Sequence, residues 1–365
     1  MIIKLSALFL CLLLVITVPV LLERQAHALP EEDDNNNGGE IYAGAEPSSI
    51  VDVSKAEYTY GEMVEDLAEL ANAYPDKMSY EKIGGSLDGR DIYAVTLGDP
   101  NAKNEIVVTA GVHGREYLTP LLVMAQLEHY LQNYASGSYG GVKYSEIFDD
   151  YSIRIIPMCN PDGIVISQRG LEGLNSLELR SAVISIYEKD KKDKLFEGSM
   201  SEYLSKWKAN ARGVDINRNF DTEDWGHGSN MSRPCFMNYH GESPESEPET
   251  KAITDYVKGL KNPVLSLSVH SQGEVIYFNC GQENYTESYL LAEAVSEFCK
   301  YELKLEERRD SAFDDWCNKA LGIPAVTIET GSLPCPLPIS EFEKIWNSNR
   351  ELWAFAVLYH KNIKE

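Results

Sequence analysis

The stretch that decides the fold is EIVVTAGVHGRE, residues 105–116 of a chain of 365. Its first half, Glu105–Ala110, is rich in β-branched residues and predicts a strand. Gly111 and Gly114 allow a tight turn directly after it, at the place where active-site loops gather in open α/β sheets. An amphipathic helix is predicted from Pro120 to about Gln132. The stretch therefore indicates an α/β fold with a polar loop at a strand end.

Strands and helices continue to alternate along the rest of the chain. Strands are predicted at Asp91–Leu97, Glu105–Ala110, Ser152–Met158, Val264–Val269, Glu274–Phe278 and Ala325–Ile328. Helices are predicted at Tyr60–Ala73, Pro120–Gln132, Pro248–Leu260, Ser288–Tyr301 and Ile339–His360. This alternation indicates a single α/β domain in which helices flank a mixed central sheet. The sequence contains no internal repeat.

The composition fits a globular protein and disfavours one class of partner. Apolar residues make up 43% of the chain and charged residues 25%, which excludes disorder along the whole length. The 57 acidic residues outnumber the 33 basic ones, and the formal net charge is −24. A surface this acidic repels phosphate backbones, so we expect no nucleic-acid partner.

The N-terminal residues have the layout of a secretory signal. Lys4 precedes an apolar run from Leu5 to Leu22, and the small-residue site Ala26-His27-Ala28 follows. We therefore predict that residues 1–28 are a signal peptide. The alternative is an uncleaved anchor, because an apolar run of this length approaches what a bilayer requires. Either way the rest of the chain is expected to be secreted or in the cell envelope, with membrane contact only through this segment.

Beyond residue 28 the chain divides into a linker and one folded domain. Residues 29–52 form an acidic, low-complexity linker that is too polar to bury a core, and residues 53–365 form the domain. In an oxidising compartment its cysteines could form up to three disulfides. These are Cys159, Cys235, Cys280, Cys299, Cys317 and Cys335. No CxxC occurs, which disfavours a cysteine-based zinc site.

Three residues near predicted strand ends are candidate ligands for one metal ion. His113 and Glu116, three residues apart, can present a ring nitrogen and a carboxylate oxygen to the same ion, although a chance HxxE is as plausible. His270 follows the strand Val264–Val269, and taken alone it is more often a hydrogen-bonded core histidine. Together the three leave a fourth coordination position open, as in a catalytic zinc site.

Other charged residues are candidates for a base and for anion-binding groups. Glu329 follows the strand Ala325–Ile328 and could act as a general base, although a lone glutamate is more often a helix cap or a surface ion pair. Arg218 offers a planar fork for a carboxylate, with Asn217 as a neutral donor beside it, although an Asn-Arg-Asn run could also be a turn with a surface arginine. Lys208 could stabilise an oxyanion as a point charge.

Five motifs follow one another along the chain. They are His113-x-x-Glu116, Asn160-Pro161-Asp162-Gly163, Gly213-Val214-Asp215-x-Asn217-Arg218-Asn219, His270-Ser271 and Asp315-Trp316…Thr327-x-Glu329. In this order they resemble the zinc carboxypeptidase family, from about Ala56 to the C-terminus. The resemblance implies that family's fold, a peptide substrate, one Zn²⁺ per chain bound by the His113, Glu116 and His270 side chains, and Glu329 as the base that activates the attacking water. It also implies that Asn217 and Arg218 hold the substrate's terminal carboxylate.

The sequence departs from the family pattern at two places. Lys208 stands where the family usually has an oxyanion-stabilising arginine, and Arg212 nearby is the alternative for that role. The family's substrate-closing tyrosine is missing from Leu305–Phe313, and Tyr301 is only a distant candidate. Asp314 occupies the position that in this family lies at the base of the pocket for the leaving residue, and the resemblance implies that a carboxylate there favours an amine-bearing side chain. The alternative is that Asp314 caps the following helix.

Three functions are compatible with these residues. The segment from His270 to Phe278 resembles the bacterial branch that cleaves γ-D-glutamyl-diamino-acid bonds in peptidoglycan stem peptides. The first alternative is a metallocarboxypeptidase that releases C-terminal Lys or Arg from proteins and peptides. The second is an inactive peptide-binding module of the same fold, which is disfavoured because the residues at all four metal and base positions are present.

Overall fold

The computed structural model describes residues 49–279, 285–306 and 311–364. The predicted signal peptide and most of the predicted linker lie outside these residues. Within them, no helix is both long and apolar enough to cross a bilayer. The last residues of the predicted linker pack onto the domain, because the backbone N–H groups of Ile50 and Val51 donate to the Glu128 carboxylate at 2.7 and 3.0 Å. The packed domain therefore already includes Val51, which is fully buried.

An eight-stranded sheet in the order β1-β2-β6-β3-β7-β10-β8-β9 forms the centre of the domain. The strands are β1 (Met78–Gly85), β2 (Asp91–Leu97), β3 (Asn104–Thr109), β6 (Tyr151–Ile156), β7 (Pro263–Ser271), β8 (Val275–Asn279), β9 (Glu302–Glu306) and β10 (Ala325–Thr330). The inner strands β6, β3, β7 and β10 are parallel, whereas β2 and β8 run antiparallel to their inner neighbours. The predicted mixed sheet is confirmed. A separate hairpin pairs β4 (Ser138–Tyr139) with β5 (Val142–Lys143).

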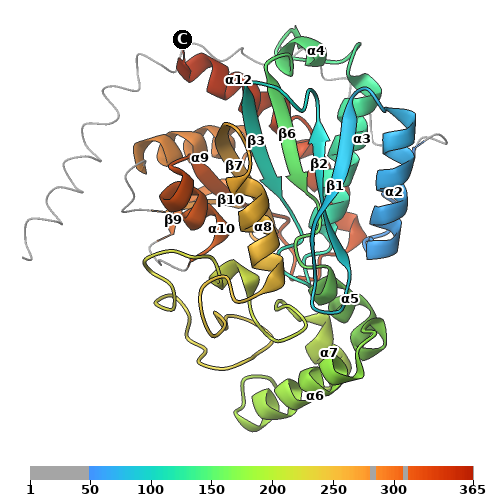
Figure 1. The fold of residues 1–365 in the computed structure, drawn as a ribbon, viewed down its shortest axis with the longest axis vertical. Coiled ribbons are helices and arrows are strands. Elements are labelled where there is room, and N and C mark those ends of the chain that lie inside the picture. The colour runs from blue at the N-terminus through green and yellow to red at the C-terminus, as the bar shows by residue number, and fades with distance from the viewer. Residues whose placement is uncertain (1–48, 280–284, 307–310, 365) are drawn as a thin grey trace, which may run out of the picture.

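Helices cover both faces of this sheet (Figure 1). They are α2 (Tyr60–Ala73), α3 (Leu118–Asn133), α4 (Tyr144–Ile147), α5 (Pro161–Arg169), α6 (Leu177–Lys192), α7 (Met200–Ser205), α8 (Pro248–Lys258), α9 (Tyr285–Cys299), α10 (Phe313–Trp316), α11 (Phe342–Asn349) and α12 (Leu352–Lys364). Alternate residues of β3 face opposite layers. Ile106 belongs to the core that includes α3 and α12, whereas Val107 belongs to the core that includes α8 and α10. A third apolar cluster joins α5, α6 and α7, which lie together below the sheet in Figure 1.

The elements predicted from periodicity are present, with one difference. The predicted helix Ile339–His360 is two helices, α11 and α12, separated at Arg350–Glu351. The Glu351 carboxylate accepts a hydrogen bond of 2.7 Å from the Tyr144 hydroxyl at this point. Periodicity alone did not show the break, because both helices bury apolar residues in the same core. Strand β1 was not predicted, since most of its side chains are exposed and its sequence lacks an apolar alternation.

None of the disulfides that the cysteines could form is found among the described residues. Cys159, Cys235, Cys299, Cys317 and Cys335 all carry free thiols. Cys280 lies outside the described residues. The first four of these thiols are buried at separate places in the apolar clusters, so packing accounts for them.

Candidate active site

Three neighbouring strands at the centre of the sheet bring the predicted catalytic residues together. His113 lies in the loop after β3, His270 near the end of β7 and Glu329 near the end of β10. Glu329 is the register partner of His270 in the parallel β7–β10 pair. Because parallel strands end at the same edge of a sheet, residues distant in sequence converge there.

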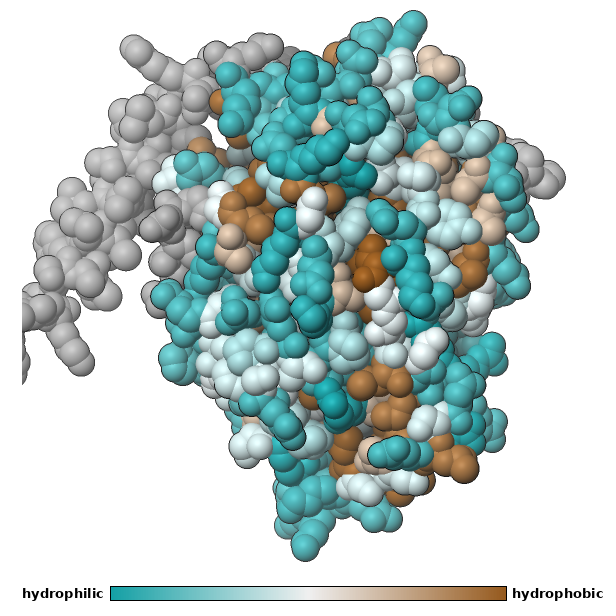
Figure 2. Space-filling view, viewed as in Figure 1, coloured by the Kyte–Doolittle hydropathy of each residue, from teal (hydrophilic) through white to brown (hydrophobic). Residues whose placement is uncertain are grey.

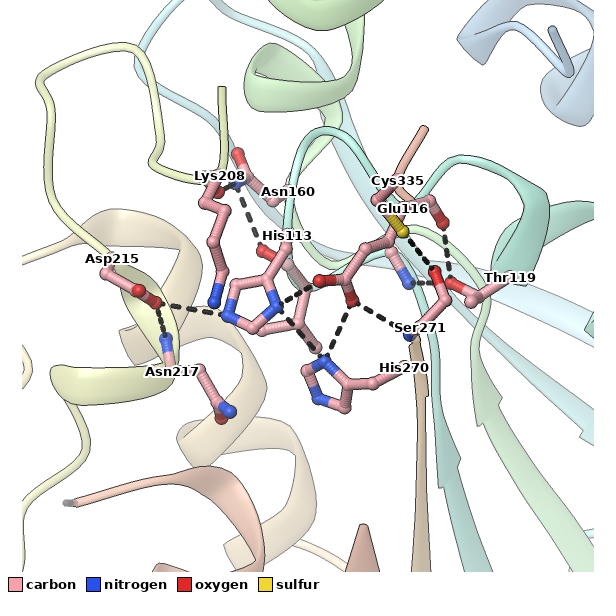
Figure 3. Close-up of polar contacts among 12 residues, drawn as sticks. His113, Glu116, Thr119, Asn160, Lys208, Asp215, Asn217, His270, Ser271 and Cys335 are labelled. Atoms are coloured by element: carbon pink, nitrogen blue, oxygen red, sulfur yellow. Dashed lines mark hydrogen bonds and ion pairs between the residues drawn. The ribbon is translucent and has the colours of Figure 1, made fainter. Parts of the chain in front are cut away.

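His113, Glu116 and His270 form one buried group (Figure 3). His113 Nδ1 lies 2.8 Å from Glu116 Oε1, and His270 Nδ1 lies 3.0 Å from Glu116 Oε2. The two Nδ1 atoms are 3.2 Å apart. Zinc binds such atoms at about 2 Å, so ligand atoms of one ion must lie within about 4 Å of each other. The convergence of two imidazole nitrogens and a carboxylate therefore fits a zinc ion.

The far side of each imidazole ring contacts a polar side chain. His113 Nε2 lies 3.2 Å from Asp215 Oδ1, and His270 Nε2 lies 3.1 Å from Ser268 Oγ. Asp215 is fully buried, and its carboxylate also accepts hydrogen bonds of 3.1 Å from the backbone N–H groups of Asn217 and Asn238. Such contacts fix the orientation of a metal-binding imidazole. Asp215 was not among the predicted site residues, although the motif that contains it was noticed.

The electrostatics of Asp215 suit this contact. Burial raises the pKa of the Asp215 carboxyl, but the nearby His113 and Lys208 side chains outweigh burial and hold the pKa well below its usual range. The carboxylate is therefore ionised beside the ring, where it favours a proton on Nε2 and leaves Nδ1 free to bind a metal.

A pocket of about 370 Å³ opens beside the metal-binding group. Its lining residues are Arg115, Glu116, Lys206, Lys208, Ser271, Gln272, Glu329, Pro334 and Cys335. Burial and the nearby Glu116 carboxylate raise the pKa of Glu329 to about 7. A carboxylate with a raised pKa that faces a polar pocket is suited to accept and return a proton near neutral pH.

Comparison with known proteins decides the family. A model of the family described as "Zinc carboxypeptidase" matches residues 63–352. The chain belongs to the zinc carboxypeptidase family. It is therefore a hydrolase of peptide bonds, and zinc is the metal that its His-Glu-His group can bind.

Proteins similar to this zinc carboxypeptidase include an endopeptidase and a carboxypeptidase. Gamma-D-glutamyl-L-diamino acid endopeptidase 1 of Lysinibacillus sphaericus is 29% identical over 79% of this chain and 69% of its own length. Human mast cell carboxypeptidase A is 26% identical over 62% of this chain and 48% of its own length. The solved structure of bovine thrombin-activatable fibrinolysis inhibitor has a TM-score of 0.65 at 21% identity, covers 85% of this chain and 99% of that chain, and confirms the fold alone.

Lys208 and Arg212, the two candidates for the oxyanion role, lie in different surroundings in this zinc carboxypeptidase. Lys208 lines the pocket, and its charge offsets part of the rise in the pKa of Glu329. Arg212 points elsewhere, because its Nη2 lies 2.9 Å from both oxygens of the buried Glu247 carboxylate. The expectation that Arg212 could substitute for the family's arginine is therefore not supported by its position.

We expect Lys208→Met to lower kcat by roughly 10²–10³-fold, the usual cost of removing one oxyanion-stabilising group. Arg212→Met serves as the comparison. It is expected to change kcat little and to lower thermal stability, because the buried Glu247 carboxylate loses its cation. Peptidase kinetics and thermal melts of both variants measure these effects. A larger loss of kcat in Arg212→Met than in Lys208→Met would contradict the assignment.

Asn217 and Arg218 lie on the Asp215 side of the metal-binding group, in the short helical turn Ile216–Arg218. Figure 3 shows Asn217 beside Asp215 and away from Glu116. Asn217 Oδ1 accepts a hydrogen bond of 3.0 Å from the backbone N–H of Phe313, which leaves its amide NH₂ as the donor for a ligand. Arg218 is half-buried, and its Nη1 donates to the Asn217 carbonyl at 2.8 Å.

Asp314 is buried in α10 and does not line the pocket. Burial and the adjacent Asp315 raise the pKa of Asp314 to about 8, which favours the protonated form of this carboxyl at neutral pH. Asp315, rather than Asp314, makes the cap contact, since the Ala312 N–H donates to Asp315 Oδ2 at 3.4 Å. Tyr301 is engaged in the core, where its hydroxyl accepts a 2.9 Å hydrogen bond from Asn349 Nδ2.

Proposed function

We propose that this zinc carboxypeptidase is an exported enzyme that hydrolyses the bond between γ-D-glutamate and a diamino acid such as diaminopimelate in peptidoglycan stem peptides. The proposed substrate rests on the similarity to gamma-D-glutamyl-L-diamino acid endopeptidase 1, which extends over 79% of this chain. Human mast cell carboxypeptidase A aligns with 62% of the chain, a smaller share. Export rests on the signal-like layout of residues 1–28.

Each side chain of the site has a separate role in the proposed reaction. His113, Glu116 and His270 would hold zinc, which would act as a Lewis acid and lower the pKa of the attacking water. Glu329 takes the proton of the attacking water and returns it to the leaving amine. Lys208, whose Nζ forms no ion pair among the described residues, stabilises the negative charge that develops on the carbonyl oxygen.

The leaving residue of the substrate is held on the Asp215 side of His113, where Asn217 and Arg218 lie. Arg218 pairs with its terminal carboxylate through the guanidinium fork, and Asn217 adds a neutral donor from its free amide NH₂. These contacts place the bond that precedes the terminal residue at the metal-binding group. The terminal carboxylate of the substrate thus determines which peptide bond is cleaved.

The experiment incubates the purified mature chain with two peptides, L-Ala-γ-D-Glu-diaminopimelate and a peptide that ends in lysine. We expect cleavage of the γ-D-Glu-diaminopimelate bond, identified by mass spectrometry of the products. Cleavage of the lysine peptide alone would replace the cell-wall substrate by the alternative, release of C-terminal Lys or Arg. Cleavage of neither peptide by zinc-loaded protein would favour the inactive peptide-binding module.

A further inference from the structure

The carboxamide of Asn160 lies where two loops of the site meet. Asn160 is fully buried and directly precedes α5. Its Nδ2 donates to the Val112 and Ala209 carbonyls at 3.1 Å each and to the Lys208 carbonyl at 3.3 Å, so these acceptors share its two hydrogens. Val112 directly precedes His113. One side chain therefore joins the loop of a metal-binding histidine to the loop of the lysine assigned to the oxyanion (Figure 3).

The backbones of these loops are in direct contact. The Gly114 N–H donates to the Lys208 carbonyl at 3.1 Å. A Cβ atom at Gly114 would overlap the carbonyl group of Gly163 and lie 2.8 Å from the carbonyl oxygen of Trp207, so no larger residue fits there. The loop after β3, the start of α5 and the loop of Lys208 thus pack backbone against backbone, and Asn160 donates across this contact.

The Lys208 segment is held from its other side as well. The N–H groups of Lys208 and Ala209 both donate to the Phe236 carbonyl, at 2.9 and 3.0 Å. From this fixed backbone the Lys208 side chain extends toward His113 in Figure 3. Misplacing a group of an active site by about 1 Å can cost on the order of 10²-fold in rate, so the contacts that fix this backbone matter for the reaction.

We propose that Asn160 is a positioning residue, whose carboxamide holds Lys208 at the distance from the metal-binding group that the oxyanion requires. The inference rests on the proposed function only through the role of Lys208, and it applies whichever residue the substrate releases. Negative charge develops on the carbonyl oxygen only as the transition state forms. Asn160 is therefore expected to contribute to kcat and hardly to KM.

Two substitutions separate the donor of the Asn160 side chain from its acceptor. Asn160 Oδ1 accepts a hydrogen bond of 2.9 Å from the Gly163 N–H and so caps α5. Asn160→Asp and Asn160→Ser both keep an oxygen that can cap the helix, but neither supplies the amide NH₂. For each we expect kcat on L-Ala-γ-D-Glu-diaminopimelate to fall roughly ten- to a hundredfold, with KM within about threefold of the wild type and with zinc retained.

A double-mutant cycle with Lys208→Met shows whether this loss passes through the lysine. If Asn160 acts by placing Lys208, its variants lose little further kcat once the ammonium is absent. We expect a further loss of at most about threefold in the Lys208→Met background, against roughly ten- to a hundredfold in the wild type. A purely structural effect would give the same fold-loss in both backgrounds.

Asn349→Asp is the matched control. Asn349 is a buried asparagine of α11, and its Nδ2 donates to the Ile345 carbonyl at 2.8 Å and to the Tyr301 hydroxyl at 2.9 Å. It does not line the pocket. Asn349→Asp is expected to lower the melting temperature, because two buried hydrogen bonds lose their donor, and to leave kcat unchanged.

Each result decides the role of Asn160. An unchanged kcat in its two variants, failure of both to fold, loss of zinc from them, or an equal fold-loss in the Lys208→Met background overturns that role and leaves the proposed function standing. A wild-type kcat in Lys208→Met overturns both the oxyanion assignment and this inference. If the wild type cuts only a lysine-terminated peptide, the proposed substrate fails and the cycle is run on that peptide. A loss of kcat that disappears when Lys208 is replaced supports the proposal.

Discussion

Glu329→Gln is expected to lower kcat by roughly 10²–10⁴-fold, the usual contribution of a positioned general base. Glutamine has nearly the same shape as glutamate but cannot accept the proton of water. Glu329 is half-buried, faces the pocket and stands opposite His270 in the parallel β7–β10 pair, so no large rearrangement is expected. Steady-state kinetics on the γ-linked peptide measure the loss.

Two controls distinguish loss of the general base Glu329 from loss of the metal-binding group. Zinc content and melting temperature of Glu329→Gln should match those of the wild type, because Glu329 is not one of the three residues of the metal-binding group. Glu343→Gln removes an exposed carboxylate of α11 and should leave kcat unchanged. A kcat for Glu329→Gln within a factor of a few of the wild type would show that another group takes the proton.

His270→Ala is expected to abolish stoichiometric zinc binding and, with it, measurable hydrolysis. The substitution removes one of the three converging ligands and leaves His113 and Glu116, which do not complete a zinc site by themselves. Metal analysis after dialysis and a peptidase assay measure the two losses. His227→Ala, at a histidine whose side chain is 74% exposed, is the control and should retain both properties.

Asp215→Ala tests the contact behind His113. Removing a carboxylate that orients a metal-binding imidazole typically lowers metal affinity by about 10- to 100-fold. Asp215→Ala should therefore lose zinc to a competing chelator more readily than the wild type, and added zinc should restore part of its activity. If Asp215→Ala keeps wild-type zinc affinity, the 3.2 Å contact with His113 Nε2 does not support the metal site.

Local sequence was sufficient for much of the fold and for the metal-binding group. The helix Tyr60–Ala73 and the strand Asp91–Leu97 were predicted with the bounds that the structure has, because their periodicity is set by neighbouring residues. The motifs around His113, His270 and Glu329 placed reactive side chains at strand ends, and the parallel sheet brings those ends together. Helices, strands and motifs of this kind are determined by residues that are close together in the sequence.

The tertiary structure decided what depends on contacts between distant segments. Spacing along the sequence could not show that Lys208 lines the pocket while Arg212 pairs with the Glu247 carboxylate. The support of His113 by Asp215 likewise arises only when separate loops meet. The sequence thus determined which chemical groups this enzyme carries, and packing determined which of them face one another, since distances across the fold are fixed by the sheet order and not by spacing along the chain.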